Sequence, residues 1–341
     1  MARVFLTGAT GYLGGDALHR LSASKGPKLS VSCLVRDATK AQDVAKAYPS
    51  VRIVQGDLDD THLIETEARN SDIVIHLAAT AHLASSKAIA KGLAEGDRES
   101  VGHWLQISGA TLLATKEIAE GRFGFKDDKV YDDVKDIQKV HSIIKNNTQR
   151  AVDLLVVSQD PLKVKTALLV GPHIYGTGRG PTNTRSIQAP EYARATLKLK
   201  EGFRLGEGEN SWSTIHVQDL SDLTASLVDA AAEEKSGLWN EDGIYFPENG
   251  DMEFGELGAR IAAEAHKQGL IPKSSVKKVI DAKEADSLSG HASILWGTNA
   301  VIKSSRAGSL LEWKPYHPSL RDEIPAIVRR EAKTQRAKSE L

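Results

Sequence analysis

Short apolar runs alternate with helical patterns through the first half of this chain. The apolar runs predict buried strands at Ala2–Leu6, Leu29–Val35, Val51–Val54, Ile73–Leu77, Gly102–Ile107 and Val164–Val170. Apolar residues at helical spacing between them predict helices at Tyr12–Ser22, Thr39–Ala47, Thr61–Ala68, Ala84–Glu99 and Gln149–Val157. Such alternation indicates a parallel sheet with helices on both faces and right-handed crossovers. The pattern predicts an α/β fold built on a Rossmann-type doubly wound parallel sheet.

The composition changes after Gly171. Residues 171–190 are rich in Gly, Pro, Thr and Asn, which is typical of a loop that leaves the sheet. Helical patterns follow at Ala189–Lys200 and Gln218–Glu233, and a charged helix begins near Ile324. We therefore expect two parts, a Rossmann domain (residues 1–171 plus 215–238) and a smaller C-terminal substrate-binding lobe (residues 172–214 plus 239–341).

A glycine-rich turn directly follows the first predicted strand and opens the first helix. Gly8 permits the tight turn, Gly11 lets the backbone approach a pyrophosphate, and Gly14 lets the helix pack close to the strand. The N-terminus of the helix would present free N–H groups to the phosphates. The turn predicts a dinucleotide site. We expect the cofactor to contact Thr7, Gly8, Thr10, Gly11, Tyr12, Leu13 and Gly14.

The residue after the second strand bears on the choice of dinucleotide. Enzymes that use NAD usually carry an acid here, which accepts from the ribose hydroxyls. This chain has Arg36, whose guanidinium suits a 2′-phosphate, although Asp37 could still meet a ribose hydroxyl. We therefore expect NADP(H) in preference to NAD(H).

Composition excludes several other classes of function. The 341 residues include 44 Lys and Arg against 45 Asp and Glu, with a pI near 6.8, so charge favours neither nucleic acid nor an anionic membrane as a partner. No apolar run approaches the roughly 20 residues that span a bilayer. Cys33 is the single cysteine and lies in an apolar run. With a strand predicted from residue 2, we expect a cytoplasmic protein without a signal peptide. No His, Cys and Asp cluster has metal-ligand spacing, and we expect no metal.

Five segments in the expected order resemble the extended short-chain dehydrogenase/reductase family, in its epimerase/dehydratase branch, and especially its fungal members. They are Thr7–Gly14, Gly56–Leu58, His76–Ala79, Gly171–Gly176 and Ile215–Leu220. The resemblance covers nearly the whole chain. It implies that Asp57 and neighbouring Leu58 lie at the adenine, that Ala78 and Ala79 line the ribose, and that Pro172 approaches the nicotinamide. Tyr175 could touch the cofactor or substrate there, or equally it could pack in the interior. It also implies a small-molecule substrate and a possible homodimer.

In that family a Ser or Thr after the fifth strand, a Tyr and a Lys four residues later form a proton relay. This sequence departs from the pattern. Aligning Ser108 and Gly109 with the motif puts Ala110 at the usual hydroxyl position, although Thr111 could substitute. The helix that leads into the sixth strand carries Arg150 and Leu154 where Tyr and Lys are expected. The relay therefore looks degraded.

One formal match to the spacing remains, Tyr131 and Lys135. It lies 35 residues before Thr166, far from the helix that feeds the sixth strand. Asp132 and Asp133 beside the tyrosine would oppose phenolate formation. Tyr131 is thus a candidate proton donor, with Lys135, Ser108 and Thr111 as its partners. Alternatively it belongs to an inserted loop that borders the pocket, where it packs or contacts substrate.

Two arginines in the loop after the sixth strand are candidates for binding substrate. Arg179 and Arg185 could hold a carboxylate or a phosphate, or they could be solvated loop residues.

The sequence supports an NADP(H)-binding enzyme that acts on a small organic molecule, such as one of specialised metabolism. It would act as a reductase, or, because the relay looks degraded, as a redox-neutral isomerase, dehydratase or cyclase. The alternative is a non-catalytic module that senses NADP(H) and regulates a partner. A second lobe of more than about a hundred residues favours the enzyme.

Overall fold

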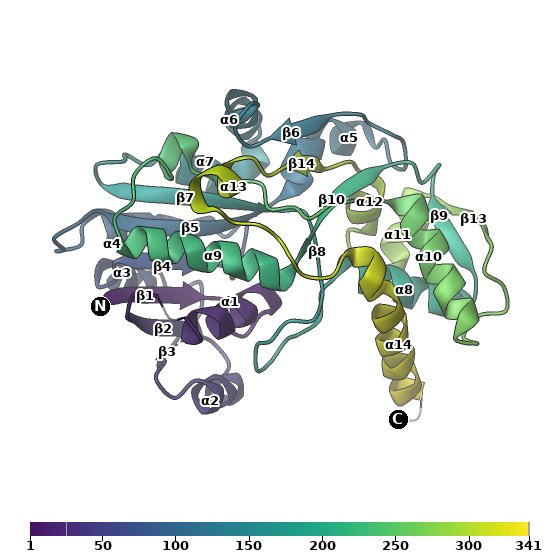
Figure 1. The fold of residues 1–341 in the computed structure, drawn as a ribbon, viewed down its shortest axis with the longest axis horizontal. Coiled ribbons are helices and arrows are strands. Elements are labelled where there is room, and N and C mark those ends of the chain that lie inside the picture. Colours follow the sequence, from purple (N-terminus) through teal and green to yellow (C-terminus); the bar gives the residue numbers. More distant parts are fainter. Residues whose placement is uncertain (25, 340–341) are drawn as a thin grey trace.

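The computed structural model describes residues 1–24 and 26–339, and its centre is a seven-stranded parallel sheet (Figure 1). In spatial order the strands are β11 (Ile244–Tyr245), β7 (Val164–Gly171), β5 (Gly102–Gly109), β4 (Ile73–His76), β1 (Ala2–Thr7), β2 (Leu29–Val35) and β3 (Arg52–Gln55). The chain builds β1 to β3 toward one edge and then returns to place β4 beside β1. In sheets of this kind the crevice for ligands forms where the strand order reverses.

The six predicted strands are present, each within two residues of its expected bounds. The seventh, β11, comes from residues 244–245, which we had assigned to the C-terminal lobe. It pairs with β7 through Ile244 and Tyr245. Two residues are too few to show a periodic pattern, so only the pairing reveals this strand.

Helices cover both faces of the sheet. One face carries α1 (Tyr12–Ser22), α2 (Ala38–Ala47) and α9 (Val217–Ala232), and the other carries α3 (Thr61–Arg69), α4 (Leu83–Ala94) and α7 (Ala151–Val157). Alternate residues of β1 separate the two cores: Leu6 belongs to the first and Phe5 to the second. Burying each such side chain contributes about 2 kcal/mol before the loss of conformational entropy.

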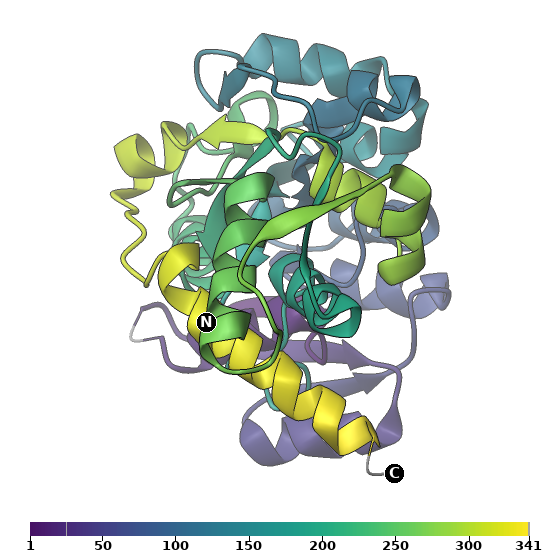
Figure 2. The same cartoon turned by 90° about the vertical axis from the view of Figure 1, so that its right-hand side faces the viewer.

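The C-terminal lobe lies beside the carboxyl edge of the sheet (Figures 1 and 2). Its strands are β8 (His173–Tyr175), β10 (Ser211–His216) and β12 (Asp251–Glu253) in one sheet, and β9 (Gly202–Leu205) paired with β13 (Val276–Ile280). Its helices are α8 (Gln188–Leu199), α10 (Phe254–Lys267), α11 (Ala282–Leu288), α12 (Ala292–Gly297) and α14 (Leu320–Ser339). Tyr192 stacks on Phe203 with ring centroids 4.4 Å apart and meets Trp296 at 5.0 Å. These buried rings fill the centre of the lobe.

The segment of residues 110–150 also contacts the C-terminal lobe, because one of its strands pairs with a strand of that lobe. Residues 110–150 form η1 (Ala110–Ala114), α5 (Thr115–Glu120), β6 (Val130–Asp132), α6 (Ile137–Lys145) and η2 (Thr148–Arg150). The strand β6 pairs in parallel with β14 (Val301–Lys303), which precedes α13 (Arg306–Leu311), while η3 (Asn240–Asp242) leads into β11. Within residues 1–24 and 26–339, we find no helix with the length and apolar character that a bilayer span requires.

Candidate functional site

The glycine-rich turn has the geometry of a phosphate cradle. Gly8 has a φ of 87°, which a side chain would disfavour, and the Gly11 N–H donates to Gly8 O at 2.8 Å. A Cβ on Gly14 would lie 2.2 Å from Gly8 O, so the helix can approach the turn only with glycine there. Gly11 caps α1 without a side-chain hydrogen bond. The first N–H groups of α1 are therefore available to a bound anion.

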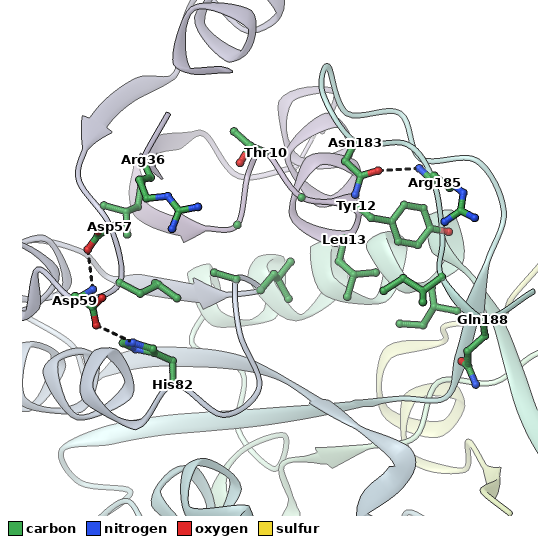
Figure 3. Close-up of a pocket in the computed structure, with 18 of the residues that line it drawn as sticks. Thr10, Tyr12, Leu13, Arg36, Asp57, Asp59, His82, Asn183, Arg185 and Gln188 are labelled. Carbon is green, nitrogen blue, oxygen red and sulfur yellow. Dashed lines mark hydrogen bonds and ion pairs between the residues drawn. The ribbon is translucent and has the colours of Figure 1, made fainter. Parts of the chain in front are cut away.

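A cleft of about 700 Å³ runs from this turn along the carboxyl edge of the sheet (Figure 3). At one end are Arg36, Asp57 and His82, and at the other are Arg185 and Gln188. Pro172, which follows β7, and Leu295, whose carbonyl accepts from Gln188, also line the cleft. The predicted cofactor residues that line it are Gly8, Thr10, Gly11, Tyr12, Leu13, Arg36, Asp57, Leu58, Ala78 and Pro172. An elongated cleft with a phosphate cradle in its middle fits a dinucleotide.

Four predicted cofactor residues lie outside the cleft lining. Gly14 packs against the backbone of the turn and so lets the helix approach it closely. Thr7 Oγ1 is hydrogen-bonded to His76 Nδ1 at 2.6 Å in the buried interior. Ala79 lies beside β5 and accepts at its carbonyl from Gln106 Nε2. Tyr175 is fully buried in the C-terminal lobe, where its hydroxyl donates to Pro318 O at 2.7 Å. The structure therefore gives Tyr175 a packing role instead of a nicotinamide contact.

Near β2 the cleft is lined by the Arg36 guanidinium, while the carboxylate of the neighbouring Asp37 is already hydrogen-bonded. The Asp37 carboxylate is the N-cap of α2 and accepts from Lys40 N at 2.9 Å. Arg36 is exposed, and among the described residues its guanidinium has no ion-pair partner. We had left open whether Asp37 meets a ribose hydroxyl, and the cap now accounts for that carboxylate.

Residues 176–187, which we call the crossing loop, lie over the N-terminal turn of α1. Tyr12 donates its hydroxyl to Gly176 O at 2.9 Å, and Thr182 Oγ1 donates to Thr10 O at 2.7 Å. Arg179 makes a bidentate pair with Asp16, with Nε at 3.0 Å and Nη2 at 2.8 Å. Burial opposes the charged form of Asp16, but the Arg179 and Ser221 hydrogen bonds outweigh it and hold its pKa below the ordinary value. Our prediction that Arg179 binds substrate gives way to this structural pair.

Arg185, the other candidate for a substrate cation, does line the cleft, but two carboxylates hold it. Its Nε and Nη2 lie 2.8 and 3.0 Å from the Glu331 carboxylate, and Nη2 lies 2.8 Å from Glu191. Glu331 comes from α14, 146 residues further along the chain, so no local signal in the sequence could have revealed it.

The formal Tyr-x-x-x-Lys match does not form a helical pair. Tyr131 lies in β6 and Lys135 in the turn that follows, where its side chain is exposed. Tyr131 is buried under the Lys139 ammonium, 4.7 Å from its ring centre, and burial raises the pKa of its phenol. Neither residue is among those that line the cleft. Tyr131 therefore packs in the interior, which is one of the two roles expected of it in an inserted loop, and it does not line the cleft.

At the end of β5 the structure instead assembles Ser108, Thr111, Arg150 and Asp153. Ser108 donates to Asp153 Oδ2 at 2.9 Å, and Arg150 Nη2 donates to Thr111 Oγ1 at 2.6 Å. Arg150 Nη1 is 3.7 Å from Asp153, whose Oδ1 is buried without a partner among the described residues. Burial raises the pKa of Asp153 to about 6, against the opposing effects of Arg150 and Ser108. We had considered Ser108, Thr111 and Arg150 but not Asp153, which stands in an apolar helix.

This shift predicts a pH-dependent difference between wild type and Asp153→Asn. An acid whose pKa is about 6 when folded and 3.8 when unfolded lowers stability as pH rises through that interval. The asparagine variant lacks this loss, so its unfolding free energy relative to wild type should rise by up to about 3 kcal/mol between pH 3.5 and 7. Urea unfolding across this range measures the difference. A constant difference would contradict the raised pKa, and Asp160→Asn, an exposed site, is the control.

A cluster of polar side chains around Asp219 holds residues 316–318 against α9. His317 Nδ1 lies 2.7 Å from Asp219 Oδ1, and the rings of His216 and His317 stack 4.7 Å apart. Potential ligand atoms of these three residues lie within 4.8 Å of one another. However, His216 Nδ1 already accepts from Gln218 N, and Asp219 also accepts from Tyr316 N. Asp219 pairs with His317, and these bonds explain the cluster as a structural one.

Comparison with known proteins agrees with the cleft geometry. A family model described as NAD(P)H-binding matches residues 8–157. The oxidase ucsJ of an Acremonium species is 37% identical over 341 residues, which is 97% of each chain. Two solved structures share the fold at low identity. The dTDP-glucose 4,6-dehydratase DesIV of Streptomyces venezuelae, with NAD and TYD bound, has a TM-score of 0.65 at 16% identity over 98% of each chain. The UDP-glucose 4-epimerase of Thermotoga maritima has a TM-score of 0.61 at 15% identity, over 98% of this chain and 99% of its own. The chain therefore belongs to the same family as the oxidase ucsJ, with an NAD(P)H-binding domain, and it has the fold of the dTDP-glucose dehydratases and UDP-glucose epimerases of the extended short-chain dehydrogenase/reductase type.

Proposed function

We propose that this protein is an NADP(H)-dependent oxidoreductase that acts on a small organic molecule. The observation that carries the proposal is the cleft itself. The phosphate cradle lies at its middle, Arg36 lies at one end, and the C-terminal lobe closes the other end through Gln188 and Leu295. A cofactor stretched along this cleft would bring its nicotinamide toward Pro172, and a substrate would bind between that ring and the lobe. The relationship to an oxidase supports redox chemistry.

The preference for NADP(H) rests on the contrast between Arg36 and Asp37. The uncommitted guanidinium offers the planar donors that suit a phosphate, while the neighbouring carboxylate is used to cap α2.

Replacing Arg36 with alanine should weaken NADPH binding by about 10- to 100-fold, because a hydrogen bond to a charged group contributes about 1.5–3 kcal/mol. NADH affinity should change less than threefold, since NADH lacks the 2′-phosphate. Fluorescence titration with both nucleotides measures this. Lys46→Ala removes a cation from the far end of α2 and is the matched control. An equal loss for NADPH and NADH would show that Arg36 does not read the phosphate.

The family's usual proton donor has no counterpart in this proposal. A bound NADPH would supply the hydride, the chain would position the substrate, and water would supply the proton. We assign no proton transfer to Tyr131 and Lys135, because they share no helix face and stand outside the cleft lining. The group of Ser108, Thr111, Arg150 and Asp153 stands at the carboxyl end of β5, where Gly109 pairs with Gly171, next to Pro172. These four side chains do not line the cleft either, so we propose that the group orders the nicotinamide end of the site indirectly, through the backbone at the end of β5.

The proposed function is tested by incubating the protein with NADPH and a panel of uncharged ketones, aldehydes and enones. Oxidation of NADPH in proportion to product, followed at the absorbance of the reduced nicotinamide, would support an oxidoreductase. Product without a change in absorbance would instead indicate redox-neutral chemistry. Tight NADPH binding with no turnover of any compound would favour a cofactor sensor. Failure to bind NADPH or NADH would overturn the proposal.

A further inference from the structure

We infer that the substrate is a small uncharged molecule with a largely apolar surface, and that the site rejects the sugar nucleotides bound by structurally similar enzymes. This inference rests on the proposed function, because it places the substrate at the Pro172 end of the cofactor cleft.

The cleft is lined by few basic residues. Its basic lining residues within the described chain are Arg36, His82 and Arg185. Arg36 lies at the opposite end, and the His82 nitrogens contact Ser85 and Asp59. Arg185 is held by Glu331 and Glu191, so its charge is already neutralised. A second diphosphate bound near Pro172 would find no uncommitted cation, and desolvating phosphate without one is strongly unfavourable.

The side chains at that end are mostly apolar. Pro172, Ile174, Ile187 and Leu295 line the cleft, and Ile187 is 62% exposed, so its side chain is free to contact a ligand. Two amides, Asn183 and Gln188, line the cleft as well (Figure 3). Asn183 Oδ1 accepts from Arg185 N at 3.1 Å, and Gln188 Nε2 donates to Leu295 O at 2.8 Å. Such a lining favours an apolar body with few polar groups.

The lobe also limits the size of the substrate. Trp296, which follows Leu295 in the chain, packs with Tyr192 and Phe203, and all three rings are at most 1% exposed. The whole cleft measures about 700 Å³, within the range of about 300–1,000 Å³ for a site that holds a single ligand. Most of that space is needed for a dinucleotide, which leaves room beside it for a small molecule only.

Calorimetry on the full chain saturated with NADPH tests the inference. The probes are 1-acetonaphthone, which is a neutral aromatic ketone, and 1-naphthoate, which has similar size and shape but carries a negative charge. UDP-glucose and dTDP-glucose are titrated alongside. We expect the ketone to bind at least tenfold more tightly than the carboxylate, and neither sugar nucleotide to give heat at 1 mM.

The variant Ile187→Lys places a cation at the apolar end on an exposed side chain that folding does not need. It should reverse the preference, weakening the ketone and strengthening the carboxylate by about fivefold each. Leu162→Lys, at a leucine that is 83% exposed and outside the cleft, should leave both affinities unchanged.

Two failures are distinguishable in this experiment. If NADPH itself does not bind, the proposed function falls. If NADPH binds but a sugar nucleotide binds more tightly than the ketone, or the ketone gives no heat or no advantage over the carboxylate, the inference is overturned and the proposed function stands.

Discussion

Replacing Gly14 with alanine should lower the affinity for NADPH by at least a hundredfold. The new Cβ would lie 2.2 Å from Gly8 O and 2.4 Å from Gly8 C. Both atoms are backbone, so no side chain can rotate away and the turn or the helix must shift. Displacing the cradle removes hydrogen bonds to the phosphates, and losing about 3 kcal/mol corresponds to two orders of magnitude in affinity.

Fluorescence titration with NADPH measures this loss, and a thermal melt of the same sample reports whether the fold survives. Gly290→Ala is the matched control, because a Cβ there meets nothing within 4 Å and the glycine does not have a positive φ. An affinity within threefold of wild type would mean that the turn is not the phosphate site.

Replacing Asp16 with alanine should destabilise the protein by about 3 kcal/mol. The Asp16 side chain is fully buried and accepts from the Arg179 backbone and guanidinium, so its removal leaves a partly buried cation unpaired. The crossing loop would lose its main attachment to α1. We therefore expect faster proteolysis within residues 176–187 as well as a lower midpoint in urea.

The pair should also respond to acid. Because the pKa of Asp16 is lowered in the folded chain, its contribution is complete above the ordinary value of 3.8 and is lost as pH falls through the lower folded value. The matched control is Glu95→Ala, which breaks an exposed pair with Arg69 and should cost less than about 1 kcal/mol. Equal effects of the two substitutions would contradict a structural role for the Asp16 pair.

The sequence predicts those parts of the site whose residues contact near neighbours in the chain or the adjacent strand. Gly8 and Gly14 are constrained by atoms within a few residues or by the neighbouring strand, so a short motif is informative about them. Arg36 directly follows β2, and its place at the edge of the sheet follows from the strand pattern. The sheet itself was predictable for the same reason, since its longer strands are continuous apolar runs.

The parts that could not be predicted depend on contacts between distant residues. Arg179 meets Asp16 across 163 positions, and Ser108 meets Asp153 across 45. The sequence alone does not show whether the guanidinium of a loop arginine pairs with a carboxylate of the protein or binds a ligand. Tyr131 had the right spacing but the wrong element, because β6 pairs with β14 from the end of the chain.

The position of Glu331 on the final helix has a practical consequence for shortened forms of this protein. That carboxylate reaches back to Arg185 in the cleft, and the preceding Arg330 contacts Thr177 Oγ1 at 2.6 Å. Truncation before residue 330 would leave Arg185 with Glu191 as its remaining carboxylate partner in the described chain and would release the crossing loop from α14. Ligand screens are therefore best run on a form that keeps the final helix.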